Sequence, residues 1–279
     1  MKKLFRIFDC STIGIAIVVA LAVPALVYAR QNALAGGENS KTTVDPAPES
    51  DVAANQIVSK LLVENERRKE SLQHYTVVRT YEIRTKEGRL DAQAVVRMEY
   101  RAPDVKTFEK TSEKGSAIVR HLVFDGLMNS ETETSSGKQH HDSALTPANY
   151  VFHLAREEDL GPHHCFVLDV VPKRKDKYLF EGTIWIESRE FAVAKIDGHP
   201  AKKPSFWVKH VDFVRQFQNV DGFWLPLRDE TQVDVKLYGK RVFTIDHREY
   251  LINADSPLRG SSRDTGGNML VAPSATLRP

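Results

Sequence analysis

An alternation of apolar and polar residues with a period of two runs through most of the chain, and it constrains the fold more than any other feature. It is clearest in residues 223–236, where alternate positions are largely apolar and the positions between them include Arg228, Glu230 and Asp234. Such alternation is typical of a β-strand with one buried and one solvent-facing side. Asp221 and Gly222 precede this run, and both residue types tolerate the positive φ angles of a tight hairpin turn. We therefore expect a hairpin here.

Similar runs recur at short intervals on either side of this hairpin. We expect strands at residues 75–84, 90–100, 105–111, 117–124, 165–171, 178–186, 190–196, 206–220, 223–236 and 241–251. Short polar turns such as residues 86–89 separate them, which indicates antiparallel neighbours. The sequence therefore predicts about ten antiparallel strands.

Two segments have helical spacing instead. Apolar residues recur every three or four positions in residues 54–62, after Ser50 and Asp51, which are suited to capping a helix. Residues 146–155 begin with Thr-Pro and contain a short apolar stripe, so we expect a second helix of about three turns there. The polar stretch 126–145 between the two segments reads as a loop. A sheet of about ten strands is too wide to stay flat, so the predicted fold is α+β, a curled antiparallel half-barrel covered by a leading and an inserted helix.

The first residues have the composition of a targeting segment. Lys2, Lys3 and Arg6 precede the uncharged apolar residues 13–28, which is the pattern of a bacterial signal peptide. We expect residues 1–29 to direct export to the cell envelope, with cleavage after Ala29 or Ala35. An uncleaved membrane anchor is the alternative, although the apolar run is shorter than the roughly 20 residues that span a bilayer.

Composition divides the rest of the chain. Residues 30–50 and 252–279 are small, polar and proline-containing, so we expect a flexible linker and a disordered tail around one domain at 51–251. Only Cys165 remains after cleavage, which excludes an internal disulfide. The 39 basic and 37 acidic residues nearly balance, so the overall charge predicts binding neither to nucleic acid nor to an anionic membrane.

Known catalytic and metal-binding patterns give weak matches. His140, His141 and Asp142 form one cluster, and His163, His164 and Cys165 form another, but neither has the spacing of a metal site. In a strand, His163 and Cys165 would share a face and His164 would not. No nucleophile or phosphate-binding motif is present, and Cys165 begins an apolar strand where a buried thiol is expected. We expect no cofactor, no metal and no enzyme activity.

The strand pattern between residues 165 and 250 resembles the bacterial LolA/LolB-like superfamily. The resemblance lies in the runs CFVLDVVP at 165–172, YLFEGTIWI at 178–186 and GFWLP at 222–226, with the strands at 191–196 and 211–217 between them. That superfamily includes outer-membrane lipoprotein-sorting proteins and the RseB-type sensor domain. Membership would imply an incomplete barrel, closed by helices, that accommodates acyl chains or hydrophobic peptide segments.

Pattern and resemblance together predict a non-enzymatic envelope protein that binds a lipid or a lipoprotein acyl chain inside the curled sheet, with outer-membrane lipoprotein sorting as its setting. The alternative is a sensing or scaffold module that binds another envelope protein, and an enzyme is the third interpretation. Candidate ligand-binding residues are Tyr178, Phe180, Ile184, Ile186, Leu225, Leu227 and Val233. The strand pattern does not separate residues that line a cavity from residues of the core.

Overall fold

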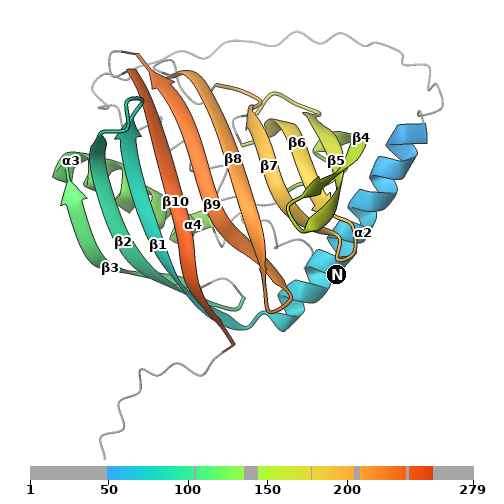
Figure 1. The fold of residues 1–279 in the computed structure, drawn as a ribbon, viewed down its shortest axis with the longest axis horizontal. Coiled ribbons are helices and arrows are strands. Elements are labelled where there is room, and N and C mark those ends of the chain that lie inside the picture. Colours follow the sequence, from blue (N-terminus) through green and yellow to red (C-terminus); the bar gives the residue numbers. More distant parts are fainter. Residues whose placement is uncertain are drawn as a thin grey trace, which may run out of the picture.

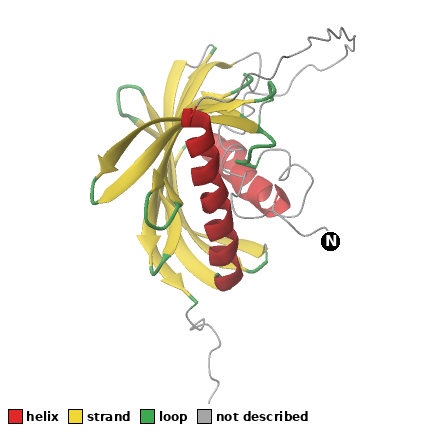
Figure 2. Ribbon diagram, turned by 90° about the vertical axis from the view of Figure 1, so that its right-hand side faces the viewer, coloured by secondary structure: helices red, strands yellow, loops and turns green. Residues whose placement is uncertain are grey.

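The computed structural model describes residues 49–103, 105–134, 144–176, 178–203, 208–236 and 239–253. Ten strands of this part form one antiparallel sheet, in the order β3-β2-β1-β10-β9-β8-β7-β6-β5-β4 (Figure 1). Their bounds are β1 His74–Thr85, β2 Leu90–Arg101, β3 Val105–Gly115, β4 Tyr150–Leu160, β5 His163–Pro172, β6 Phe180–Glu187, β7 Ala192–Pro200, β8 Val208–Val220, β9 Phe223–Val235 and β10 Gly239–Ile252. The sheet is curled, with helices on its hollow side (Figure 2). The predicted fold class is confirmed, whereas the expected signal peptide and nearly all of the linker and tail lie outside the described residues.

The antiparallel order gives the sheet two distinct ends. Odd-numbered strands finish at one end, which we call the upper rim, and even-numbered strands finish at the other, the lower rim. β10 pairs with both β1 and β9, so the first and last strands lie side by side in the middle of the sheet. β3 and β4 form its two edges.

The helix α2 (Glu49–Ser71) runs from the upper to the lower rim over β4 to β7. Near its start Asp51 is hydrogen-bonded to His153, and near its end the Arg68 guanidinium donates to the Glu190 carbonyl. Its inward residues recur every three or four positions, which places them on one face of the helix. They are Ala54, Ile57, Val58 and Leu61, and all are buried. The predicted leading helix is confirmed.

The second helical region lies at residues 117–134 and not at 146–155. It consists of α3 (Ala117–Val119), the π-helix η1 (Arg120–Asp125) and α4 (Gly126–Thr134). Prediction of a strand at 117–124 was wrong, as was the loop over 126–134, while residues 135–143 lie outside the described part. This segment is helical because the Ser116 hydroxyl accepts a hydrogen bond from the Val119 N–H and so caps the first turn. The apolar residues that follow then line one helical face against β1, β2 and β10, namely Val123, Phe124, Leu127 and Met128.

Prediction of a helix at 146–155 was also wrong, because most of this segment belongs to the edge strand β4. The Thr146 carbonyl accepts hydrogen bonds from the N–H groups of Asn149 and Tyr150, each at 3.0 Å, so Thr-Pro opens a single turn. Tyr150 and Phe152 then alternate on the buried face and pack beneath α2. Period two therefore describes this segment better than period 3.6.

The strand β9 follows its predicted alternation except at one residue. Asp221 and Gly222 have φ angles of 51° and 85°, which confirms the tight turn before the strand. Gln216 pairs with Arg228, whereas the next residue of β8 pairs with Pro226, so Leu227 is the extra residue of a β-bulge. Leu227 is accordingly 40% exposed, and its predicted place on the buried face was wrong.

Candidate functional site

Apolar side chains on the concave face form four clusters, and helices cover two of them. One lies under α2 and another under η1 and α4. Of the described residues, none from a helix joins the third cluster, which comprises Val208, Val211, Val233 and Val235 on β8 and β9. The fourth lies near the lower rim on β1, β2, β3 and β10, and again includes no residue of a described helix. The helices therefore leave part of the apolar sheet face to other contacts.

The fourth group, which we call the aromatic cluster, is centred on Tyr75, Tyr100, Phe108 and Tyr250. The Tyr75 ring stacks on Tyr100 with centroids 5.2 Å apart and lies 5.8 Å from Tyr250. Hydroxyl groups of Tyr100 and Tyr250 donate to main-chain carbonyls, at 3.0 and 2.7 Å, so their hydrogen bonds are made within the protein. Tyr100, Phe108 and Tyr250 are half-buried. The cluster thus offers fixed aromatic surface that is partly open to solvent.

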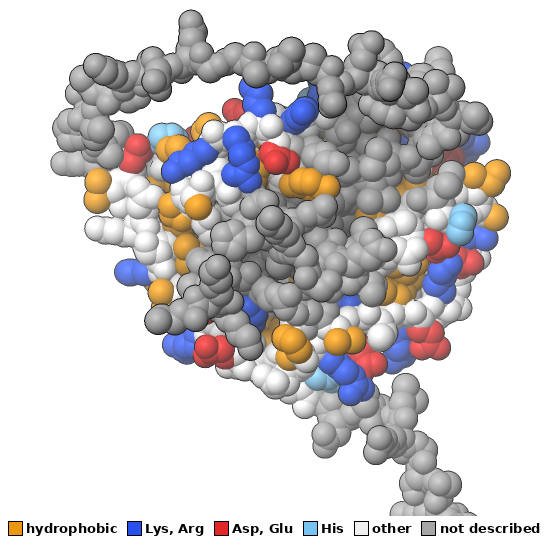
Figure 3. All heavy atoms as spheres, turned by 180° about the vertical axis from the view of Figure 1, so that it is seen from behind, with side chains coloured by type: hydrophobic (Ala, Val, Ile, Leu, Met, Phe, Trp, Pro, Cys, Tyr) orange, Lys and Arg blue, Asp and Glu red, His pale blue; other side chains and the backbone are white. Residues whose placement is uncertain are grey.

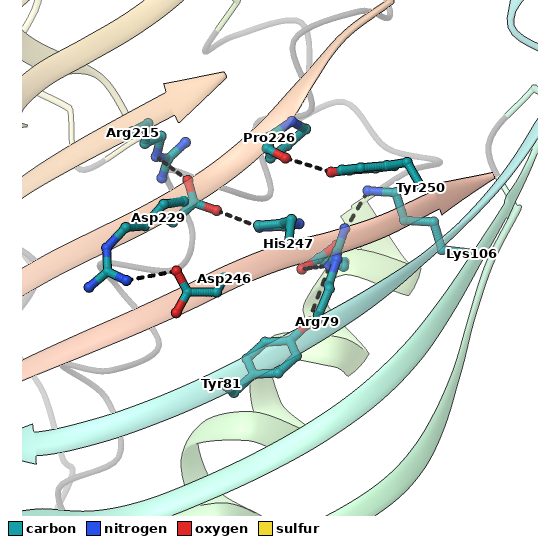
Figure 4. A network of polar contacts seen from close by, with 11 residues as sticks. Arg79, Tyr81, Lys106, Arg215, Pro226, Asp229, Asp246, His247 and Tyr250 are labelled. Carbon is teal, nitrogen blue, oxygen red and sulfur yellow. Dashed lines mark hydrogen bonds and ion pairs between the residues drawn. The ribbon is translucent and has the colours of Figure 1, made fainter. Parts of the chain in front are cut away.

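A buried ionic network lies beside the aromatic cluster on the same face (Figure 4). Its centre is Glu131 of α4, whose carboxylate oxygens both accept from Nη1 of Arg79 at 3.0 Å. Lys106 Nζ lies 3.4 Å from the same carboxylate, and Arg79 Nη1 also donates to the Tyr81 hydroxyl. The Arg79 guanidinium lies 5.8 Å from the Phe108 ring, which connects the network to the aromatic cluster. Ion pairs therefore fix α4 to β1 and β3.

A second buried pair lies next to this network, on β9 and β10. His247 Nε2 is 3.1 Å from the Asp229 carboxylate, and the same carboxylate forms an ion pair with Arg215 of β8 at 3.6 Å (Figure 4). All three side chains are almost completely buried. Two buried polar atoms in this region, Arg79 Nε and His247 Nδ1, have no hydrogen-bond partner among the described residues. Buried polar atoms of this kind are uncommon in proteins.

Burial and neighbouring charges shift the proton affinities of these groups. Burial alone would raise the pKa of Glu131, but Arg79 and Lys106 outweigh it and lower that pKa to about 2. Burial lowers the pKa of His247 and nearby Arg79 adds to the effect, against the opposing influence of Asp229. Burial raises the pKa of Tyr81 to about 12. At neutral pH the network therefore contains an ionised glutamate and a neutral histidine.

The predicted ligand-binding residues do not converge on one place. Phe180, Ile184 and Ile186 are fully buried in the cluster under α2. Val233 belongs to the valine cluster of β8 and β9, and Leu225 is buried in β9. Tyr178 is half-buried beside the start of β6, and Leu227 is exposed at the bulge. These residues line different parts of the sheet.

Sequence reasoning missed the residues of the ionic network, although a signal for them was present. Arg79 occupies an apolar-face position between Val77 and Tyr81, and Asp229 lies on the same side of its strand as Val233. A charged residue at a position that the alternation assigns to the buried face indicates a buried ion pair or a functional group. Glu131 similarly continues the helical stripe of Leu127.

The histidines and the cysteine singled out in the sequence have structural contacts. The His163 ring packs on Trp224, and His164 is hydrogen-bonded to Glu157 and Asp159 on the surface. Burial raises the pKa of the Cys165 thiol to about 11, which keeps it protonated and unreactive. No group of three potential ligands stands close enough to hold a metal ion within the described residues, and His140, His141 and Asp142 lie outside them. None of the described helices combines the length and apolar character needed to cross a membrane.

Comparison with known proteins gives a family match over part of the chain. The family model described as "Family of unknown function (DUF5686)" matches residues 142–247, which is less than half of the sequence. No curated protein matches the chain.

Several solved structures match at low identity. A putative outer membrane lipoprotein-sorting protein domain from Vibrio parahaemolyticus is 12% identical, and the match covers 73% of this chain and 93% of that one, with a TM-score of 0.38. A LolA superfamily protein from Nitrosomonas europaea is 12% identical over 72% of this chain and 94% of its own, with a TM-score of 0.34. The MucA/MucB complex of Pseudomonas aeruginosa matches at 8% identity over 70% of this chain and 93% of that one, with a TM-score of 0.25.

Proposed function

We propose that this protein is a non-enzymatic component of the bacterial cell envelope that binds a hydrophobic ligand, a lipid or a lipoprotein acyl chain, on the concave face of its sheet. The supporting observation is the aromatic cluster, which is apolar, partly open to solvent and without a residue of any described helix. Apolar surface of this kind on an exported protein commonly marks a site for a ligand or a partner.

Geometry confines the open apolar surface to the aromatic cluster. This cluster lies on the same side of β1, β2 and β10 as the apolar cluster under η1 and α4, because alternate residues of each strand face the same side. Between the two, the network of Arg79, Lys106 and Glu131 supplies a polar boundary. An acyl chain laid on the aromatic rings would gain about 25 cal/mol for each Å² of apolar surface removed from water.

The test uses the protein purified from the cell envelope with its native N-terminus and stripped of lipid by organic extraction. We expect saturable binding of a fluorescent fatty-acid analogue, displaced by lipid recovered from the extract and identified by mass spectrometry. Tyr100→Ala and Phe108→Ala each remove a half-buried ring and should weaken binding about tenfold, because a large aromatic contact is lost.

The matched control is Leu251→Ala, which shortens an exposed apolar side chain next to Tyr250, where 54% exposure shows that little packing is lost. It should leave binding unchanged. Circular dichroism confirms that each variant is folded. A folded, stripped wild-type protein that takes up no analogue would overturn the ligand proposal and favour a protein-binding module instead.

A further inference from the structure

We propose that the upper rim docks on an anionic phospholipid membrane. Separate connections and strand ends bring exposed lysines to this rim from across the width of the sheet. They are Lys86, Lys114, Lys175, Lys202, Lys203 and Lys240. Seen from behind, Lys and Arg side chains lie on the upper part of the described surface beside Asp and Glu side chains, and both kinds also occur on its lower part (Figure 3). The rim is therefore a broad basic surface that no single segment of sequence reveals.

Most of this charge is not neutralised within the protein. Among the described residues, Lys114, Lys175, Lys202, Lys203 and Lys240 form no ion pair. By contrast, the acidic residues near the rim are largely engaged. Asp91 pairs with Arg89 at 3.2 Å and Arg241 at 2.8 Å, Asp176 lies 3.9 Å from Arg174, and Asp51 is hydrogen-bonded to His153. The free lysines are thus available to an external anion.

The lower rim carries charges of both signs. Glu157 and Asp159 project from the end of β4, where they flank His164 at 2.9 and 2.8 Å. Arg67, Arg101 and Arg189 are exposed at the same end. An anionic surface would therefore attract the upper rim more strongly than the lower one.

The position of the N-terminal segment favours a membrane over an acidic protein as the partner. α2 begins at the upper rim, so the residues before Glu49, including the apolar stretch 13–28, join the domain at this end. The uncleaved form, in which this stretch anchors the protein, would therefore hold the basic rim towards the lipid headgroups.

The same arrangement fixes the orientation of the ligand site. α2 has 23 residues and spans about 35 Å from rim to rim. With the upper rim on the bilayer, the aromatic cluster near the lower rim faces away from that membrane. The lysines lie within a Debye length of about 8 Å of the headgroups at physiological salt, where each contributes about fivefold to the affinity.

Sedimentation with lipid vesicles tests the proposal. The protein with its native N-terminus should bind vesicles of phosphatidylglycerol and phosphatidylcholine, bind vesicles of phosphatidylcholine alone far less, and dissociate as salt is raised. The triple variant Lys175→Glu, Lys202→Glu, Lys203→Glu should lose affinity for the anionic vesicles by at least about a hundredfold, because three attractive charges become repulsive.

A matched triple variant makes the same change in net charge elsewhere. Arg97→Glu, Arg189→Glu, Arg248→Glu alters exposed side chains away from the upper rim and should retain most of the binding. Tyr100→Ala should bind vesicles like the wild type, which separates this surface from the ligand site. Equal loss in the two triple variants, or equal binding to neutral and anionic vesicles, would overturn the proposal.

Discussion

Replacing Glu131 by Gln tests whether the buried ionic network fixes α4 to the sheet. The change keeps the size of the side chain and removes its charge. Arg79 and Lys106 would then be buried without the carboxylate they share, and their side chains are each only 7% exposed. Leaving a buried charge without its partner typically destabilises a protein by about 3–5 kcal/mol.

The lowered pKa of Glu131 gives an independent measure of how much its ion pairs stabilise the folded protein. Its fall from 4.5 to about 2 corresponds to about 3 kcal/mol of stability at neutral pH, since one pKa unit is worth about 1.4 kcal/mol. In the unfolded chain Glu131 binds a proton more readily than in the folded chain. This contribution is therefore complete above the unfolded pKa and is lost as the pH falls from about 4.5 towards 2.

Urea denaturation followed by circular dichroism measures the effect. At pH 7 we expect Glu131→Gln to lower the free energy of unfolding by about 3 kcal/mol, and the difference from the wild type to shrink as the pH falls through the same window. The control is Glu109→Gln, which changes an exposed glutamate on β3 and should shift stability by less than about 0.5 kcal/mol. Equal midpoints for the two variants would refute the assigned role of the network.

The remaining predictions concern Leu225 and Leu227 of β9, the thiol of Cys165 and the imidazole of His247. Leu225→Asp should unfold the domain, because it buries an unpaired charge, whereas Leu227→Asp at the exposed bulge should be tolerated, and thermal denaturation compares the two. The thiol of Cys165 should react with a thiol reagent at pH 8 only after unfolding, because its pKa is raised to about 11, and a fast reaction in the native state would contradict its burial. The midpoint of the His247 titration measured by NMR should lie below 6.5, because burial lowers its pKa. Its unfolded form then binds more protons, so stability should fall as the pH drops below about 6.5, and a midpoint above that value would disprove the buried neutral form.

Much of the sheet could be predicted because its signal is local. Alternation along β9 and the turn at Asp221 and Gly222 report directly on which side of a strand faces the core. The secondary structure was predicted wrongly where apolar residues are adjacent in sequence. In the segment 117–128 a strand and a helix both accommodate the apolar pairs, and the hydroxyl cap of Ser116 together with packing on β1 and β10 decides for the helix. Tertiary contacts, which a local sequence pattern does not contain, therefore determine that this segment is helical.

The candidate site was harder to predict because its parts are distant in the chain. Arg79 and Glu131 are separated by 52 positions, and Asp229 and His247 by 18. Each charge is visible in the sequence as an exception to a buried pattern, but its partner is set by strand order and by the position of α4. The basic upper rim was equally hidden, since its lysines come from separate strand ends.

The central place of β10 has a consequence for how the chain folds. β1, β2 and β3 can pair as soon as they are made, and β4 to β9 can form successive hairpins, but the two groups become one sheet only when β10 inserts between β1 and β9. Until residues 239–252 emerge, both groups present an unpaired strand edge, and the contacts that close the fold join residues more than 150 positions apart. Such non-local closure is slow. A chain built in this way stays incompletely folded until its last strand is available, and any partner that binds the open edges before then would delay the native state.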